Sequence, residues 1–148
     1  MTQKHLTAKY ACYMSNASMS AVATLSPLLF ITFHQLYGIS YTRLGLLVLV
    51  NFCTQLCVDL LFSFYAHKFN IQKTVRAMPL LTVIGLMVYA IFPALAPERA
   101  YLFLVTGTII FSASAGLGEV LISPVIAALP SKNPERDMSR AHSVYAWG

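Results

Sequence analysis

Charged residues are almost absent from four long stretches of the sequence, and this distribution limits what the chain can fold into. No Lys, Arg, Asp or Glu occurs in 10–42 or in 77–97, and two further stretches contain one charged residue each, Asp59 and Glu119. A helix needs about 20 apolar residues to cross the hydrocarbon core of a bilayer. The sequence therefore predicts an all-α membrane protein with four transmembrane helices and the start of a fifth, at about 10–36, 44–66, 77–97, 101–129 and 139–148.

The composition favours the same environment. Hydrophobic residues make up 57% of the chain and charged residues 10%, whereas a soluble domain carries about 25% charged residues on its surface. The first charge-free stretch runs for 33 residues, from Tyr10 to Thr42. It is too long for a signal peptide, whose apolar region has about 7–15 residues. The lipid bilayer is therefore the expected partner of the chain.

Basic residues are unevenly divided between the two sides of the expected helices. With the N-terminus inside, eight of the ten Lys and Arg residues lie on the cytoplasmic side, and Arg43 and Arg99 lie outside. Cytoplasmic loops carry an excess of Lys and Arg, so the N-terminus and the connection 67–76 are expected in the cytoplasm. No basic patch with interleaved aromatic residues occurs, and nucleic acid is not an expected partner.

Polar residues within the expected helices recur at intervals of four, which places them along one helix face. The first helix carries such residues from Cys12 to Thr24, and the second from Asn51 to His67. Because hydrocarbon cannot hydrogen-bond them, the polar faces are expected to point inward. Two roles stay open for them: hydrogen bonds between helices, or the lining of a substrate cavity, for which the candidates are Asn16, Asn51 and Gln55. The small residues of 107–118 predict close helix packing instead.

The two acids inside the expected helices need a separate explanation. A charged carboxylate at the bilayer centre costs about 2.5–3.5 kcal/mol on insertion scales, and burial favours the neutral form of a carboxyl group. Glu119 is therefore either a group that binds and releases protons, as a proton-coupled carrier requires, or a neutral or paired acid that holds helices together. Asp59 lies nearer the cytoplasmic end of its helix, close to His67 and Lys68. Its expected role is a salt bridge or a clamp on the following loop.

The sequence offers no pattern typical of an enzyme. No nucleophile and base occur at a recognisable spacing. The three cysteines fall within expected helices, which argues against disulfides, and Cys53 and Cys57 lack the further ligands of a metal site. No enzymatic activity, cofactor or metal is predicted.

Three segments of the sequence resemble a family of membrane carriers. They are LSPLLFITFHQLYGIS (25–40), NFCTQLCVDLLFSFYAHKF (51–69) and GLGEVLISPVIAALPSKNPERDMSRAHSVYAWG (116–148). These segments resemble the N-terminal half of major facilitator superfamily transporters, and within that superfamily the bacterial fucose permease-like group. The resemblance implies a bacterial inner-membrane protein in which 1–148 forms part of an N-terminal six-helix bundle. It also implies a missing C-terminal half, which would complete a carrier of about twelve helices.

The loop between the second and third helices resembles the superfamily signature in a degraded form. His67 stands for the signature's Asp, Lys68 stands for its Arg, and later basic residues supply the remaining positive charges. In the family this loop clamps the two halves of the outward-open state. The resemblance implies a cytoplasmic loop clamp made of Asp59, His67, Lys68, Lys73 and Arg76.

The resemblance also implies a function. In fucose permeases the first and fourth helices each carry an acid for proton coupling and sugar binding. Glu119 matches the fourth-helix acid by context, whereas the first helix offers only Asn16. His142, Tyr145 and Trp147 match the fifth-helix pattern, where they would stack on a sugar or anchor a helix interface. The expected function is secondary active transport of a small polar solute such as a sugar, by proton symport.

Two other classes of function stay open. A small four-helix oligomeric exporter also uses a membrane glutamate, but typically in its first helix, where this sequence has none. A non-transporting membrane subunit, or the remnant of a degenerate gene, would use its helices for packing alone. Proton-driven solute uptake and the mass of the solubilised oligomer would separate these classes.

Overall fold

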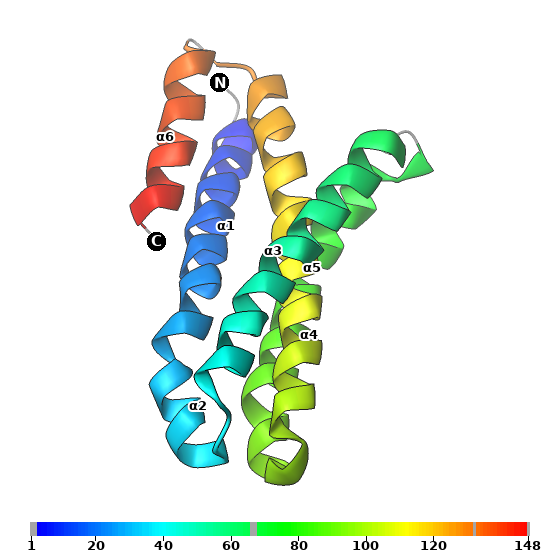
Figure 1. Ribbon diagram of the computed structural model, residues 1–148. Helices are drawn as coiled ribbons and strands as arrows, with labels where there is room; N and C mark the ends of the chain where they lie inside the picture. Colours follow the sequence, from blue (N-terminus) through cyan, green and yellow to red (C-terminus); the bar gives the residue numbers. More distant parts are fainter. Residues whose placement is uncertain (1–2, 66–67, 132, 148) are drawn as a thin grey trace.

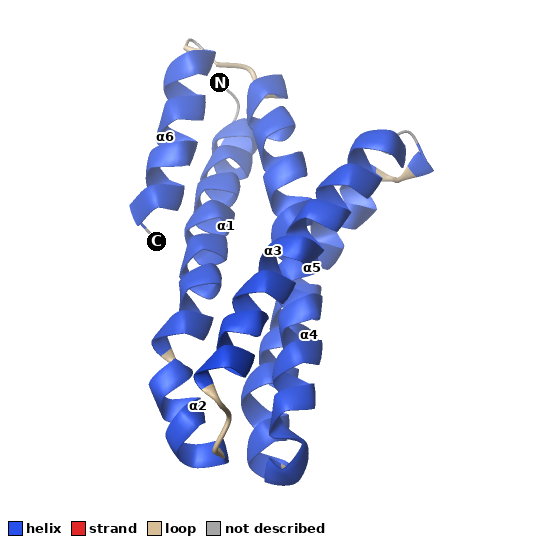
Figure 2. Cartoon of the chain, in the orientation of Figure 1, coloured by secondary structure: helices blue, strands red, loops and turns tan. Residues whose placement is uncertain are grey.

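The computed structural model describes residues 3–65, 68–131 and 133–147. All regular structure in these residues is helical, which confirms the all-α prediction (Figure 2). Within them, three helices are long and apolar enough to cross a membrane, or four if one bent pair counts as a single span. These apolar helices indicate a membrane protein.

The first expected span is broken into two helices. α1 (Gln3–Leu28) and α2 (Phe30–Tyr37) meet at an angle of 44°. Pro27 lies inside the last turn of α1, where its ring crowds the preceding turn and its nitrogen cannot donate, so the helix does not continue straight. α2 then ends at Gly38, whose φ of 62° is in the left-handed region that glycine adopts without strain.

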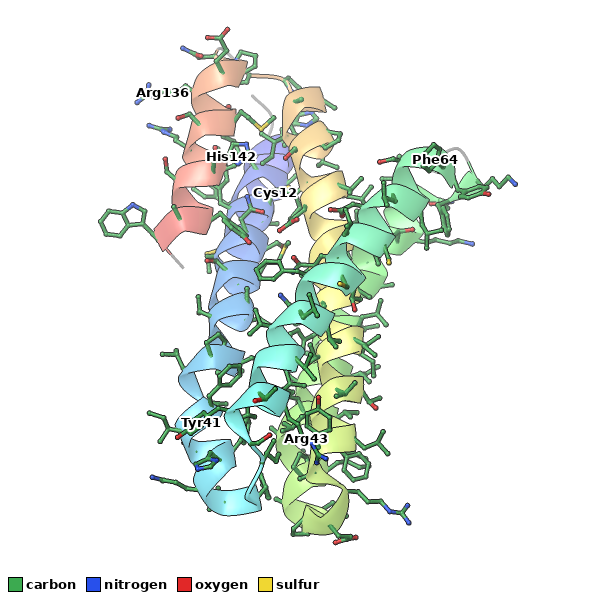
Figure 3. The ribbon with its side chains drawn as sticks, in the orientation of Figure 1. Cys12, Tyr41, Arg43, Phe64, Arg136 and His142 are labelled. Atoms are coloured by element: carbon green, nitrogen blue, oxygen red, sulfur yellow. The ribbon has the colours of Figure 1, made fainter. Side chains whose placement is uncertain are left out.

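The remaining helices run back and forth between two ends of the structure (Figure 1). The N-terminus, the α3–α4 connection and the α5–α6 connection lie at one end, and the α2–α3 and α4–α5 connections lie at the other. Arg136 and Arg43 mark these opposite ends in Figure 3. The helices are α3 (Tyr41–Tyr65), α4 (Ile71–Leu95), the 3-10 helix η2 (Pro97–Arg99), α5 (Ala100–Ala128) and α6 (Pro134–Trp147).

Two helices begin earlier than the charge pattern predicts, because asparagine caps them. The helix expected from 139 begins at Pro134, where the Asn133 side chain accepts a hydrogen bond from the Arg136 backbone N–H at 3.1 Å. The helix expected from 77 begins at Ile71, after an equivalent cap by Asn70. Asparagine at the N-cap and proline at the first helical position both favour helix initiation. The polar connections are therefore shorter than expected.

α4 and α5 pack so closely that their backbones touch. A Cβ atom on Gly85 would lie 2.6 Å from the Phe111 nitrogen, and a Cβ atom on Gly107 would lie 2.8 Å from the Gly85 carbonyl oxygen. On the same pair of helices the Thr82 hydroxyl donates to the Ser114 hydroxyl at 2.8 Å. The predicted close packing of 107–118 is confirmed.

Many large apolar side chains of the described residues are exposed on the surface. Leu28, Phe64 and Leu95 are each more than 70% exposed. The buried apolar side chains form two clusters, one around Tyr89 and Phe111 and one between α3, α4, α5 and α6. Such an outer surface suits hydrocarbon rather than water.

Candidate functional site

Glu119 lies in the second half of α5, and its side chain is exposed on the surface of this chain. The Tyr145 hydroxyl, from α6, donates a hydrogen bond to the Glu119 Oε1 atom at 3.4 Å. A bond of this length is weak. Within the described residues no Lys, Arg or His forms an ion pair with Glu119. The acid is therefore contacted by a polar neighbour without being neutralised.

Asp59, on α3, is the second acid of this region. Its carboxylate interacts electrostatically with Glu119, and its Oδ1 atom is buried with no hydrogen-bond partner in the described part of the chain. Lys68 does not pair with it, since the Lys68 ammonium lies over the Tyr65 ring, 5.1 Å from the centroid. His67, the other expected partner, lies outside the described residues. Within the described residues Asp59 therefore has no basic partner.

The other expected clamp residues lie on the first turns of α4. The side chains of Lys73 and Arg76 are exposed, and the Lys73 backbone N–H donates to the Asn70 side chain at 3.2 Å. In the portion of the chain that is described, neither side chain forms an ion pair. Their role as a clamp stays a prediction, and any acid that pairs with them lies elsewhere.

Asn51 and Gln55 join α3 to α5. The Ser112 hydroxyl donates to the Asn51 Oδ1 atom at 2.5 Å. Gln55 is buried, and its Cα atom lies 3.2 Å from where a Cβ on Gly116 would stand. Asn51 therefore hydrogen-bonds between helices, the first of the two roles left open by the sequence, whereas the contact of Gln55 with α5 at Gly116 is made by its backbone.

Asn16, on the polar face of α1, is turned toward α6 and not toward α3. The Asn16 side-chain amide is buried and donates to the Ala141 carbonyl at 3.2 Å. Thr24 is exposed and bonds carbonyls of its own helix. The expected inward assembly of three polar faces is therefore limited to α3 and α5, because α6 lies beside α1 (Figure 1).

Of the three aromatic or imidazole residues expected on the fifth helix, the structure brings one to Glu119. Tyr145 makes the hydrogen bond described above. His142, labelled on α6 in Figure 3, is exposed, and Trp147 is 90% exposed. Neither ring stacks on another aromatic ring of the described residues. Their expected role in substrate binding stays a prediction.

Sequence reasoning missed a polar contact between the start of α1 and the start of α6. The Lys9 ammonium forms an ion pair with the Asp137 carboxylate, and the Ser131 hydroxyl donates to the Asp137 Oδ2 atom at 2.5 Å. Lys9 first, and then Ser131, hold the pKa of Asp137 below its usual range. The Tyr13 hydroxyl also donates to the Asp137 carbonyl at 3.2 Å. Both charged residues are visible in the sequence. No local sequence pattern, however, indicates that Lys9 and Asp137, which lie far apart along the chain, are in contact.

A pocket of about 540 Å³ lies between α1, α4 and α5. Its lining is mostly apolar and includes the hydroxyl groups of Ser15, Ser18, Thr82 and Ser114. The Ser114 hydroxyl donates to the Met78 carbonyl at 2.8 Å, so part of this polar lining is already satisfied. None of the candidate binding residues predicted from the sequence lines this pocket.

The described residues contain no group of three or more His, Cys, Asp or Glu side chains that could hold a metal ion. Cys53 and Cys57, which lie four residues apart on α3, are both exposed. Two thiols alone do not complete the four ligands of a structural metal site.

The polar cluster of Glu119, Asp59 and Tyr145 brings together three helices, α5, α3 and α6. No protein-family model, curated protein or solved structure matches the chain. The resemblance to the major facilitator superfamily accordingly rests on the sequence segments alone and stays a prediction.

Proposed function

We propose that this chain is the N-terminal part of a proton-coupled secondary transporter of the major facilitator superfamily, which carries a small polar solute such as a sugar. Glu119 is the proton-binding group, with Asp59 and Tyr145 as its neighbours. The end of the structure that holds the N-terminus faces the cytoplasm of a bacterial cell (Figure 1). A second bundle of helices supplies the opposite wall of the solute site.

The observation that carries the proposal is the setting of Glu119. It is the one charged residue in 100–131, and within the described residues it has no compensating cation. An acid that serves only helix packing would form an ion pair with a basic residue or accept several hydrogen bonds, because an uncompensated charge in the membrane is energetically costly. An exposed, unpaired acid beside a single weak donor supports exchange of protons with the surroundings.

Protonation of Glu119 changes its interactions with residues of two neighbouring helices. Two carboxylates that lie near each other repel when both are charged, so a proton on Glu119 relieves its repulsion by Asp59. The same proton removes the charged acceptor of the Tyr145 hydroxyl. Because these partners belong to α3 and α6, proton binding alters the contacts of α5 with both helices. Alternating access requires such a change in helix packing.

The test compares two Glu→Gln variants of the complete gene product, reconstituted in liposomes. Glu119→Gln removes the proposed proton site, and Glu98→Gln, on the exposed 3-10 helix η2, is the matched control. The probes are radiolabelled L-fucose, D-galactose and D-glucose, and uptake is driven by an inward proton gradient. We expect Glu119→Gln to reduce uptake to the level of protein-free liposomes, whereas Glu98→Gln retains the wild-type rate.

Reconstitution of equal amounts of each variant is checked by quantitative immunoblotting of the liposomes. Uptake that is driven by the gradient in the wild type and unchanged in Glu119→Gln would refute the role of Glu119. Absence of gradient-driven uptake in the wild type, for every sugar probe, would refute proton-coupled sugar transport and favour a non-transporting subunit.

A further inference from the structure

A second pocket, of about 380 Å³, lies at the end of the structure where α1 and α6 begin and α5 ends (Figure 1). In contrast to the apolar pocket, the residues that line it are polar or charged, apart from Pro130. The lining includes the side chains of Lys9, Ser131, Asn133, Arg136, Asp137 and Arg140. This pocket is separate from the cluster around Glu119, none of whose members lines it.

The charges that line this pocket do not balance. Its one acid, Asp137, is already bound by Lys9 and by the Ser131 hydroxyl. Arg136 and Arg140 form no ion pair within the described residues. Glu135, the neighbouring acid on α6, does not line the pocket. Three cations and one carboxylate leave an excess of two positive charges, which fits an anionic ligand.

The arrangement of the two arginines fits a phosphate group. Arg136 and Arg140 are four residues apart, so their side chains project from the same face of α6. A guanidinium group presents parallel N–H donors that match two oxygens of one phosphate. The Lys9–Asp137 ion pair fixes α6 against α1 at the base of this face and thereby keeps the pocket in shape.

The position of the pocket indicates where the phosphate comes from. α5 carries no charged residue between Glu119 and its end at Ala128, and the pocket begins directly after it, at Pro130 and Ser131. In a bilayer that covers α5, this level is that of the lipid headgroups. Basic pockets between membrane helices bind acidic headgroups on the cytoplasmic side. We propose that this pocket binds the headgroup phosphate of an anionic phospholipid and so anchors α6 to α1 at the membrane surface. The inference rests on membrane insertion of the helices and not on transport.

The test counts bound lipid by native mass spectrometry of the protein in detergent. Phosphatidylglycerol is the anionic probe and phosphatidylcholine is the neutral one. Arg136→Gln/Arg140→Gln removes both free cations of the pocket, and Lys73→Gln/Arg76→Gln removes two exposed cations at the same end of the structure but outside the pocket. A cation that contacts the bound anionic headgroup contributes about fivefold to lipid binding. We therefore expect about 30-fold weaker phosphatidylglycerol binding in the first variant, whereas Lys73 and Arg76 lie outside the pocket and do not contact that headgroup.

The control variant should bind phosphatidylglycerol within about fivefold of the wild type, because the pocket keeps its cations. A loss in the control as large as that in Arg136→Gln/Arg140→Gln would overturn the proposal, since general attraction of lipid to basic surfaces would then explain both. Far-UV circular dichroism and size-exclusion chromatography check that both variants are folded.

Two measurements on the wild type keep the proposal testable if a variant does not fold. Equal binding of phosphatidylglycerol and phosphatidylcholine to the wild type would overturn it. Competition with millimolar inorganic phosphate separates a lipid from a soluble ligand. Retention of phosphatidylglycerol under these conditions supports the lipid headgroup, and its complete displacement assigns the pocket to a soluble phosphate and overturns the lipid proposal.

Discussion

Replacement of Gly107 by Ala is the most direct test of the contact between α4 and α5. A Cβ atom on Gly107 would lie 2.7 Å from the Tyr89 Cβ atom and 2.8 Å from the Gly85 carbonyl oxygen. Ordinary van der Waals contact begins at 3.4 Å, so the two helices must separate locally by about 0.6 Å. No change of rotamer relieves the clash, because the obstacles are backbone and Cβ atoms.

The magnitude follows from two opposing effects. A methylene forced into a well-packed interface costs about 1–3 kcal/mol, and here the separation also weakens the contact between the Tyr89 and Phe111 rings, whose centroids are 5.6 Å apart. Replacing glycine by alanine also stabilises the helix by about 1 kcal/mol, because alanine has the higher helix propensity. We therefore expect Gly107→Ala to lower the free energy of unfolding by about 0–2 kcal/mol relative to the wild type, and by about 1–3 kcal/mol relative to a Gly→Ala substitution without the clash.

Gly45→Ala, on α3, is the matched control for this substitution. It adds the same methyl group to a helix, but the new Cβ atom meets nothing within 4 Å. Its free energy of unfolding should equal that of the wild type or exceed it by up to about 1 kcal/mol. The assay is unfolding by sodium dodecyl sulfate in mixed micelles, followed by far-UV circular dichroism. Gly107→Ala as stable as Gly45→Ala would refute the close approach of α4 and α5.

Two further substitutions test individual polar contacts. Ser112→Ala removes the hydrogen bond to Asn51, so we expect a loss of about 1 kcal/mol in the same assay, the size typical of bonds between membrane helices; unfolding at the wild-type midpoint would show that the bond contributes nothing. Lys9 and Ser131 lower the pKa of Asp137 in the folded protein. The ionised carboxylate therefore stabilises the fold at pH values above its unfolded-state pKa of about 3.9. This stabilisation is lost as the pH falls through the lower pKa of the folded state. Asp137→Asn should therefore be less stable than the wild type at neutral pH and should approach it on acidification, in thermal unfolding followed by circular dichroism; a stability difference that does not change with pH would contradict this account.

The long apolar helices were predictable because they depend on the composition of each segment by itself. A stretch without charges is suited to hydrocarbon wherever it stands in the fold, and α3, α4 and α5 follow such stretches. The early start of α6 was also readable in principle, since Asn133 and Pro134 form a helix-start signal. The polarity of the residues that follow obscures this signal, because the charged residues in the first turns of α6 do not belong to an apolar stretch, and the charge pattern therefore places the start of the helix at about 139.

The candidate site around Glu119 was predictable in part. Glu119 is conspicuous in the sequence because it is the one charge in a long apolar stretch. Its neighbours were not, since Asp59 and Tyr145 come from other helices and reach it only through the packing of α3 and α6 around α5. The partner of Asn16 was missed for the same reason: periodicity identifies a polar face but not the helix that it meets.

The sequence by itself determined that this chain is helical and apolar, where its long helices lie, and that one acid lies within the last long apolar helix. Only the tertiary structure decided which faces meet. Gly107 allows α4 to approach α5, and Lys9 meets Asp137 at the base of α6. The physical reason is that solvation and helix propensity act on each segment separately, whereas contacts between helices depend on the shapes and charges of two segments at once.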